Sequence, residues 1–193
     1  MDQHKQAHMG WGHFASMIAT STVIMFFFMY QLVYSRDHAL FSVTRMLSSL
    51  VMGCVMTAVM LGFMWKMYGP QTAKVIVLAA AVVGGIALLA INRNQALIGD
   101  TDFMKGMIPH HSIAINNARK ADIRDPRVRY LADRITRDQV KEIAEMKILL
   151  QDIEEHGRRA DQRLPAAPAT LEPEGATEAR DLVSGRLLSD KPL

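Results

Sequence analysis

Two adjacent histidines follow a proline in the segment FMKGMIPHHSIAINNA, residues 103–118, and two methionines lie just upstream of them. Met104, Met107 and His111 are spaced i, i+3 and i+7, which places them within about 60° of one another on one face of a helix. His110 points about 100° away, toward a flank. Thioether sulfur suits Cu(I), whereas imidazole suits copper, zinc, iron and nickel. The pattern therefore favours a transition-metal site, with copper as the first candidate.

A second polar group interrupts the apolar stripe of the following segment. That stripe consists of Val128, Leu131, Ile135, Met146, Leu149 and Ile153. Gln139 and Glu142 occupy its two middle positions, where a buried polar pair is costly unless it is satisfied. Together with Met146 they repeat the i, i+3, i+7 spacing. Glu142 is a candidate metal ligand, or an acceptor that orients a histidine through its far nitrogen.

These two segments supply one predicted set of metal ligands. The set is Met104, Met107, His110, His111, Gln139, Glu142 and Met146. Ordinary packing is the competing interpretation, because methionine commonly fills cores and a single buried histidine is more often structural than a ligand. A purely structural network of Glu142 with Arg134 or Lys141 is its most specific form. No catalytic residue is assigned.

A helical hairpin is expected to hold these residues. The first helix should run from about 102 to 121, with a kink at Pro109, whose ring clashes with the carbonyl four residues back. The second should run from Pro126, with Asp125 as its N-cap, to about His156. The hairpin is therefore predicted to be helical, as are the segments before it, and the predicted fold class of the chain is all-α.

The predicted hairpin domain, residues 101–157, is too short to bury a large core alone. Self-association of two hairpins into a four-helix bundle is the simplest way to cover the apolar stripe, and docking onto the membrane block is the other. Because the helices run antiparallel, the ligand-rich start of the first need not face the middle of the second. A metal site can then be completed across a homodimer or higher homo-oligomer.

Three uncharged segments precede the hairpin, and they span residues 14–34, 46–65 and 75–91. Each reaches the length of about 17–25 apolar residues that a helix needs to cross a bilayer core. The first exceeds the apolar region of a cleavable signal peptide, about 7–15 residues, and two more spans follow it. Residues 14–92 are therefore predicted to be a block of three transmembrane helices in a lipid bilayer.

Charge gives little further guidance. Three lysines flank the spans on the N-terminal side and three arginines flank them on the other, so the positive-inside rule gives a tie. These residues are Lys5, Lys66, Lys74, Arg36, Arg45 and Arg93. The net charge is only +3, and acidic residues interleave with the arginines after residue 120. The sequence therefore shows no cluster of basic residues of the kind that binds nucleic acid.

Further methionines and histidines lie outside the hairpin. The tail, residues 1–13, carries His4, His8, Met9 and His13, and the second span carries Met52, Met56, Met60 and Met64 at every fourth residue. They are interpreted either as copper-entry ligands or as packing residues, and packing is favoured for the span. At the other end, residues 158–193 are rich in proline and are expected to be mostly disordered, with a short helix considered over ATEARDLVSGRLL.

The hairpin segment resembles a bacterial family known as domain of unknown function 305. The family pattern is Met-Ile-x-His-His near the start of one helix, then Leu-Ala-x-x-Ile-x-x-x-Gln-x-x-Glu-Ile-x-x-Met in the next. The matching positions are Met107, Ile108, His110, His111, Leu131, Ala132, Ile135, Gln139, Glu142, Ile143 and Met146, within about 101–156. The resemblance implies a ferritin-like bundle and, for some members, copper binding and copper tolerance outside the cytoplasm.

This chain differs from the family pattern at two points. Many relatives carry the unit twice, whereas one copy is found here, which favours a dimer. The residue after the histidine pair is usually Gln and is Ser112 in this chain. The preceding spans resemble a membrane-anchored branch of the family, which implies the bacterial inner membrane with a periplasmic C-terminal domain.

The expected function is a membrane-anchored metal-binding protein for copper storage, buffering or handover, with Cu(I) favoured. One alternative is a ferritin-like redox metalloenzyme, although no Glu-x-x-His pair occurs and Glu142 is the one carboxylate on the inner stripe. The other is a non-metal helical interaction module with a buried, pH-sensitive His/Glu network.

Overall fold

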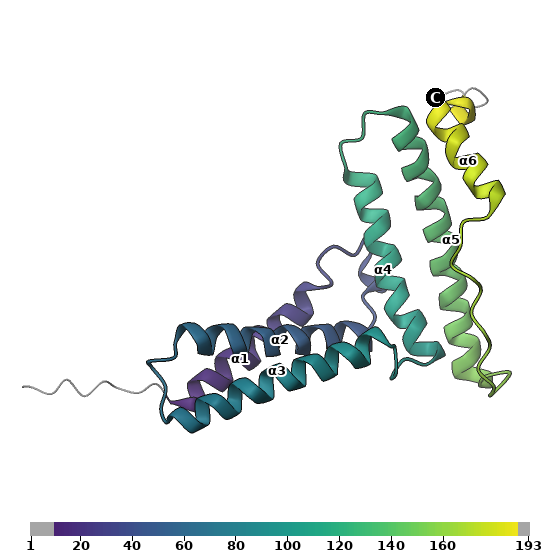
Figure 1. Ribbon diagram of the computed structural model, residues 1–193. Helices are drawn as coiled ribbons and strands as arrows, with labels where there is room; N and C mark the ends of the chain where they lie inside the picture. The colour runs from purple at the N-terminus through teal and green to yellow at the C-terminus, as the bar shows by residue number, and fades with distance from the viewer. Residues whose placement is uncertain (1–9, 189–193) are drawn as a thin grey trace, which may run out of the picture. The chain divides into compact units, whose positions relative to one another are not determined.

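The computed structural model describes residues 10–188 of the chain, and within that range the regular structure is helical throughout, without strands (Figure 1). The helices are α1 Trp11–Phe28, α2 Val43–Phe63, α3 Gln71–Arg93, α4 Asp100–Lys120, α5 Pro126–His156 and α6 Pro173–Ser184, with 3-10 turns at Arg36–His38 and Arg186–Leu188. Two compact units can be distinguished. The first contains residues 10–32 and 39–107, and the second contains 33–38 and 108–188. The predicted all-α fold class is confirmed.

Helices α1, α2 and α3 of the first unit are each long and apolar enough to cross a membrane, with 18, 21 and 23 residues. Many of their large apolar side chains face outward, such as Phe63, which is 90% exposed, and Ile86, which is 65% exposed. This exposure would be unfavourable in water, but it suits helices whose backbone groups are satisfied internally and whose surface faces lipid. The prediction of three membrane-type helices is confirmed.

The boundaries of these helices differ from the predicted ones, most clearly at the end of α1. The expected span 14–34 ends at Phe28, six residues early. The guanidinium of Arg45 donates to the carbonyl of Met29, and the Ser42 N–H donates to the Tyr30 hydroxyl at 3.0 Å. The first contact satisfies a carbonyl that a longer helix would have satisfied through its own backbone, and the second ties Tyr30 to the start of α2.

Small residues bring the three helices of the first unit close together. A Cβ added to Gly53 on α2 would lie 2.6 Å from Thr22 Oγ1 on α1, and one added to Gly85 on α3 would lie 3.2 Å from Cys54 Cβ. Glycine is therefore required at Gly53 for the observed approach of α1 and α2. Phe14, Leu61 and Tyr68 form the buried core of this unit.

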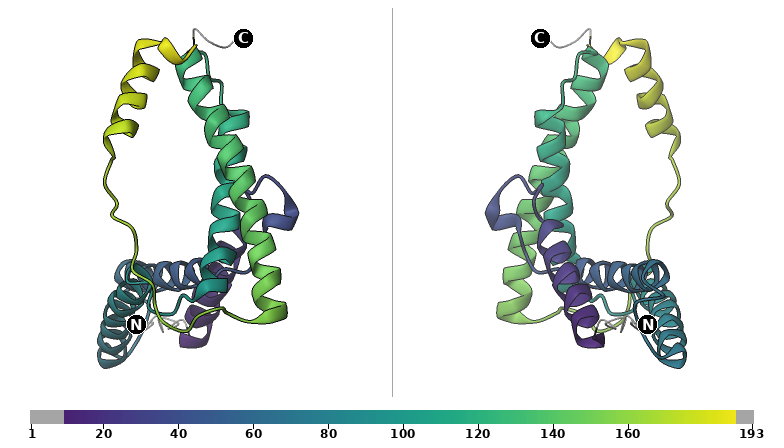
Figure 2. Two further views of the ribbon diagram at one scale, coloured as in Figure 1. Left: turned by 90° about the vertical axis from the view of Figure 1, so that its right-hand side faces the viewer. Right: turned by 90° about the vertical axis from the view of Figure 1, so that its left-hand side faces the viewer.

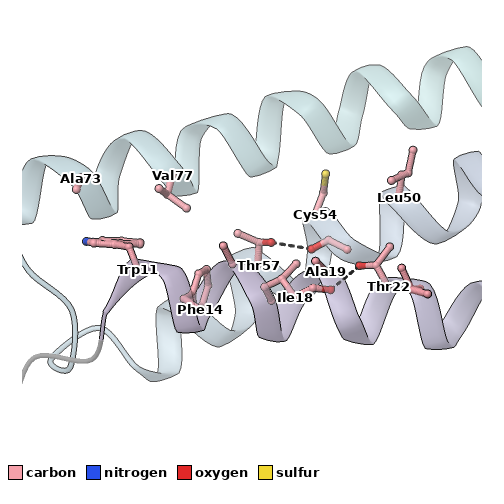
Figure 3. Close-up of a pocket in the computed structure, with 13 residues that line it drawn as sticks. Trp11, Phe14, Ile18, Ala19, Thr22, Leu50, Cys54, Thr57, Ala73 and Val77 are labelled. Atoms are coloured by element: carbon pink, nitrogen blue, oxygen red, sulfur yellow. Dashed lines mark hydrogen bonds between the residues drawn. The ribbon is translucent and has the colours of Figure 1, made fainter.

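An open apolar groove of about 820 Å³ runs along α1, α2 and α3 (Figure 3). The hydroxyls of Thr22 and Thr57 line it, and they donate to the carbonyls of Ile18 and Gly53 in their own helices, each at 2.8 Å. Because these donors are satisfied internally, the groove presents an apolar surface.

In the second unit, α4 from residue 108 onward lies antiparallel beside α5 (Figures 1 and 2). Pro109 lies inside α4, where it is fully buried. At the start of α5 the Asp125 carboxylate accepts the Arg127 N–H at 2.9 Å, and at its end Gly157 adopts a φ of 77°. The helix predicted from Pro126 to His156 is therefore confirmed at both ends, with the expected N-cap.

Within the tail, a helix overlaps the segment ATEARDLVSGRLL, for which a short helix was considered. Residues 157–172 lack regular secondary structure, but Pro173–Ser184 forms α6. Glu178 forms an ion pair with Arg134 of α5, and Arg127 Nη1 donates to the Val183 carbonyl at 3.2 Å. These contacts with a distant helix stabilise α6, and composition alone does not reveal them.

Candidate metal centre

His111 on α4 and Glu142 on α5 meet in the second unit. Nδ1 of His111 lies 3.1 Å from Oε2 of Glu142. The His111 side chain is 12% exposed and that of Glu142 is 46% exposed, so the pair sits at the edge of the buried interior. Nδ1 itself is shielded from solvent, and its approach to the carboxylate lacks the alignment of a hydrogen bond. A slight turn of the imidazole would create that bond.

Gln139 completes a three-residue cluster. Its Nε2 donates to Glu142 Oε2 at 3.2 Å, which is the same oxygen that faces His111. The competing structural network of Glu142 with Arg134 or Lys141 is not formed. Arg134 pairs with Glu178, and Lys141 pairs with Glu145 at 3.6 Å. The central Gln/Glu pair of the α5 stripe is therefore directed to the histidine.

The protonation of His111 follows from its surroundings. Burial lowers the pKa of His111 below its ordinary value, the Glu142 carboxylate opposes that shift, and neighbouring His110 adds to it. Desolvation dominates because it disfavours the charged imidazolium. At neutral pH His111 is therefore the neutral imidazole, which is the form that binds a metal ion.

The other predicted ligands have no described contact with Glu142 or Gln139. His110 is exposed, and its ring centroid lies 6.0 Å from that of His111 with the two planes at 58°. Met146 is buried on α5, one helical turn after Glu142. Met104, which is 5% exposed, and the half-buried Met107 lie on the part of α4 that belongs to the first unit. The contacts described for the predicted set thus join His111, Gln139 and Glu142.

Within residues 10–188, no group of three or more His, Cys, Asp or Glu side chains is arranged to hold a metal ion. His111 and Glu142 supply at most two ligands, whereas a tetrahedral site requires about four. A metal site on this hairpin would therefore need thioether or amide ligands, or side chains from a second copy. The buried thioether of Met146 and the amide of Gln139 have the required chemistry.

The remaining methionine and histidine predictions divide in two. His4, His8 and Met9 lie outside the described residues, whereas His13 is exposed in the first turn of α1. In the first unit Met17, Met60 and Met64 pack against the core of Phe14, Leu61 and Tyr68. For Met60 and Met64, which belong to the predicted stripe, the structure supports the packing interpretation. Met52 is 50% exposed on α2.

A feature that the sequence did not predict is the docking of residues 33–38 on the hairpin. Ser112, next to His111, is fully buried. Its Oγ accepts the Tyr34 N–H at 2.7 Å and lies 3.0 Å from Nδ1 of His38. The sequence drew attention to Ser112 only as a departure from the family pattern. Its partners come from a loop that precedes it by more than 70 residues.

Charged groups strengthen this docking. Asp37 pairs with Lys147 of α5 and accepts a hydrogen bond from Ser35, and these two bonds hold the pKa of Asp37 well below its ordinary value. Burial lowers the pKa of His38, while Asp37 opposes that shift. Arg119 lies over the ring of Tyr34, 5.4 Å from its centroid. Residues 33–38 are thus fixed to both helices of the hairpin.

Comparison with known proteins extends the resemblance noted in the sequence. Residues 100–184 match the model of the family described as "Domain of unknown function (DUF305)". A stretch of 62 residues is 44% identical to "Uncharacterized protein L153" of Acanthamoeba polyphaga mimivirus, and it covers 31% of this chain and 41% of that protein. The match thus spans less than half of the relative's length. No solved structure matches the chain significantly.

The family match runs from α4 through α6 and therefore extends beyond the segment 101–156 that carries the two sequence motifs. It includes the helix that pairs with α5 through Glu178 and Arg134. Residues 100–184 of this chain accordingly belong to the DUF305 family.

Proposed function

We propose that this protein is a membrane-anchored metal-binding protein that stores, buffers or hands over copper, with Cu(I) as the preferred ion. The observation that carries the proposal is the approach of His111 Nδ1 to Glu142 Oε2 at 3.1 Å. The three apolar helices α1, α2 and α3 are the anchor. The hairpin of α4 and α5 is the metal-binding part.

In this proposal Glu142 orients the histidine. A carboxylate that holds one nitrogen of a histidine fixes its tautomer and raises the basicity of the other nitrogen. Gln139, in the preceding turn of α5, donates a hydrogen bond to the same carboxylate. Nε2 of His111 is then the atom that binds the ion, and the neutral imidazole needs no deprotonation to do so.

Sulfur ligands favour copper over harder ions. Met146 follows Glu142 by one turn on α5, and Met104 and Met107 precede His111 by seven and four residues on α4. Thioether sulfur is a soft ligand that selects Cu(I), whereas Mg²⁺ and Ca²⁺ prefer oxygen. His110, exposed beside His111, is a further ligand from the hairpin or toward a second copy.

A homodimer or higher homo-oligomer would complete both the site and the core. Helix α5 exposes Val128 to 49%, Ile135 to 37% and Leu149 to 50%, all from the predicted apolar stripe. Two such hairpins would bury these residues in a four-helix, ferritin-like bundle. The second copy would supply the ligands that a single hairpin lacks.

The anchored arrangement is compatible with the chain's connectivity. Because three spans alternate in direction, the loop between α1 and α2 and the segment after α3 emerge on the same side of a bilayer. Residues 33–38 of that loop belong to the same unit as the hairpin. The proposed location is the bacterial inner membrane, with the hairpin in the periplasm.

The second candidate is a helical interaction module without a metal. It is favoured by one observation: Glu142 Oε2 accepts a hydrogen bond from Gln139 and lies 3.1 Å from His111 Nδ1, so the three polar groups meet without an ion. In that case the cluster would be a buried polar network that fixes the register of α4 against α5.

Titration of the full chain in detergent tests the proposal. Cu(I), Cu(II) and Zn(II) are added in competition with a chelator of known affinity, to the parent protein and to a His110→Ala/His111→Ala variant. His156→Ala is the matched control, because that side chain is 69% exposed at the far end of α5. The proposal expects tight Cu(I) binding that the double variant loses and the control keeps. Equal binding by all three proteins would eliminate the hairpin site and leave the interaction module.

A further inference from the structure

A polar pocket of about 500 Å³ lies in the second unit, lined by the last turn of α4 and the first half of α5. Its lining residues are Arg119, Arg129, Asp133, Thr136 and Arg137. We propose that this pocket binds a phosphate-type oxyanion, either inorganic phosphate or a phosphomonoester group. The proposal concerns residues separate from the metal cluster and does not depend on metal binding.

The geometry of α5 gathers the pocket's side chains on one face. Positions 129, 133, 136 and 137 are related by steps of three, four and eight residues, so they form a single stripe on a helix. Arg119 comes from the last turn of α4. Its guanidinium stacks over the ring of Tyr34, which holds it in place beside the stripe.

The charge of the pocket matches a dianion. Three guanidinium groups and one carboxylate line it, which leaves two positive charges uncompensated. Elsewhere among residues 10–188, Arg124, Arg127 and Arg134 each pair with a carboxylate on another residue. In the pocket Asp133 is the one lining carboxylate for three arginines. An anion bound among these side chains would offset their mutual repulsion.

Arg129 has donor capacity that the fold leaves unused. Its Nη2 donates to the Ala118 carbonyl at 2.9 Å and contacts Asp133 Oδ1 at 2.6 Å. Its Nε is shielded from solvent and has no acceptor among the described residues. A buried charged donor without an acceptor is unfavourable. A small rotation of the guanidinium would direct Nε toward an oxyanion in the pocket and relieve this cost.

The ligand class follows from the donors. Guanidinium groups present planar pairs of N–H donors that match the oxygens of phosphate, and they do so better than lysine. A tetrahedral dianion offers enough oxygens for three such groups. A carboxylate offers two oxygens and a single charge, which makes it the weaker fit.

Calorimetric titration of the full chain in detergent with inorganic phosphate tests the site. We expect saturable binding at one site per chain. Arg129→Lys keeps the charge but loses Nε and the fork, and Arg137→Gln removes one charge from the rim. Each should weaken phosphate binding at least tenfold. Arg124→Gln is the matched control, because Arg124 is 86% exposed and pairs with Asp122, and it should bind as the parent does.

Arg129 also donates to the Ala118 carbonyl, so far-ultraviolet circular dichroism must show that the Arg129→Lys variant is folded. If that variant is not folded, the result with Arg137→Gln decides.

A second experiment distinguishes the sources of the oxyanion. Phosphatidylcholine vesicles with or without phosphatidic acid compete against bound phosphate. Displacement only by phosphatidic acid supports the pocket with a lipid phosphomonoester as its ligand, and the absence of displacement assigns it to free phosphate.

Two results would overturn the proposal. One is the absence of saturable binding of both inorganic phosphate and phosphatidic acid. The other is binding that Arg124→Gln weakens as much as Arg137→Gln does, since that would show a general effect of surface charge.

Discussion

His111 of α4 and Glu142 of α5 face each other across the hairpin, with Nδ1 3.1 Å from Oε2. The same carboxylate oxygen accepts a hydrogen bond from Gln139 at 3.2 Å. Glu142 therefore links the histidine of one helix to the polar centre of the other. Because Glu142 faces Nδ1, the other imidazole nitrogen is the one that the proposed metal site would use.

Replacement of Glu142 by Gln is expected to lower the affinity for Cu(I) by about 10–100-fold, the usual effect of removing a carboxylate that orients a metal-binding histidine. Chelator competition with the full chain measures the change. Glu145→Gln is the control, because Glu145 follows Glu142 by three residues on α5 and pairs with Lys141 instead of His111. An affinity that stays the same in Glu142→Gln would contradict the orienting role.

Replacement of Ser112 by Ala should destabilise the second unit. Ser112 is fully buried and accepts the Tyr34 N–H at 2.7 Å. Its loss removes the partner of this half-buried donor, which costs about 1 kcal/mol. Denaturant unfolding in detergent measures the difference, with Ser184→Ala on α6 as an exposed control. Equal stability of the two variants would show that residues 33–38 are not held by this contact.

Replacement of Gly53 by Ala should destabilise the first unit by about 1–3 kcal/mol, because the added methyl would lie 2.6 Å from Thr22 Oγ1. Gly62→Ala is the control on the same helix, where nothing lies within 4 Å of an added Cβ. A Thr22→Ala replacement in the Gly53→Ala background should recover part of the loss. If Gly53→Ala and Gly62→Ala are equally stable in thermal unfolding, the close packing of α1 on α2 is not required.

The stability of the metal-free protein should decrease as the pH falls from 7 to 5. Burial lowers the pKa of both His38 and His111 in the folded state, so the unfolded chain binds more protons in this range. Stability then rises with pH. The stabilisation that depends on these two neutral histidines should be fully present above the ordinary histidine pKa of about 6.5. Its loss should level off once the pH is below the folded-state pKa values of His38 and His111. Thermal unfolding with a chelator present measures this dependence.

A His38→Asn/His111→Asn variant serves as the control for this pH profile. It should flatten the dependence between pH 7 and 5, because neither replacement titrates there. Stability that is constant or that increases on acidification in the parent protein would contradict the assignment of these two histidines as buried, neutral groups.

The sequence by itself determined the elements that depend on local patterns. Runs of uncharged apolar residues specify α1, α2 and α3, because length and hydropathy decide whether a helix can cross a bilayer. Asp125, Pro126 and Gly157 specify the ends of α5, because caps act within a few residues of the helix terminus. The two motifs of the hairpin likewise indicated the DUF305 family, which the match over 100–184 confirms.

The tertiary structure decided everything that depends on distant partners. After α1 ends at Phe28, Arg45 of α2 satisfies the Met29 carbonyl, and α6 contacts α5 through Glu178 and Arg134. The sequence shows Glu142 as a polar residue on an apolar stripe, but only the fold shows that it faces His111 and not Arg134 or Lys141. Ion pairs and hydrogen bonds form only where the fold places their groups within about 3 Å, and residue types and spacing along one segment do not determine that distance.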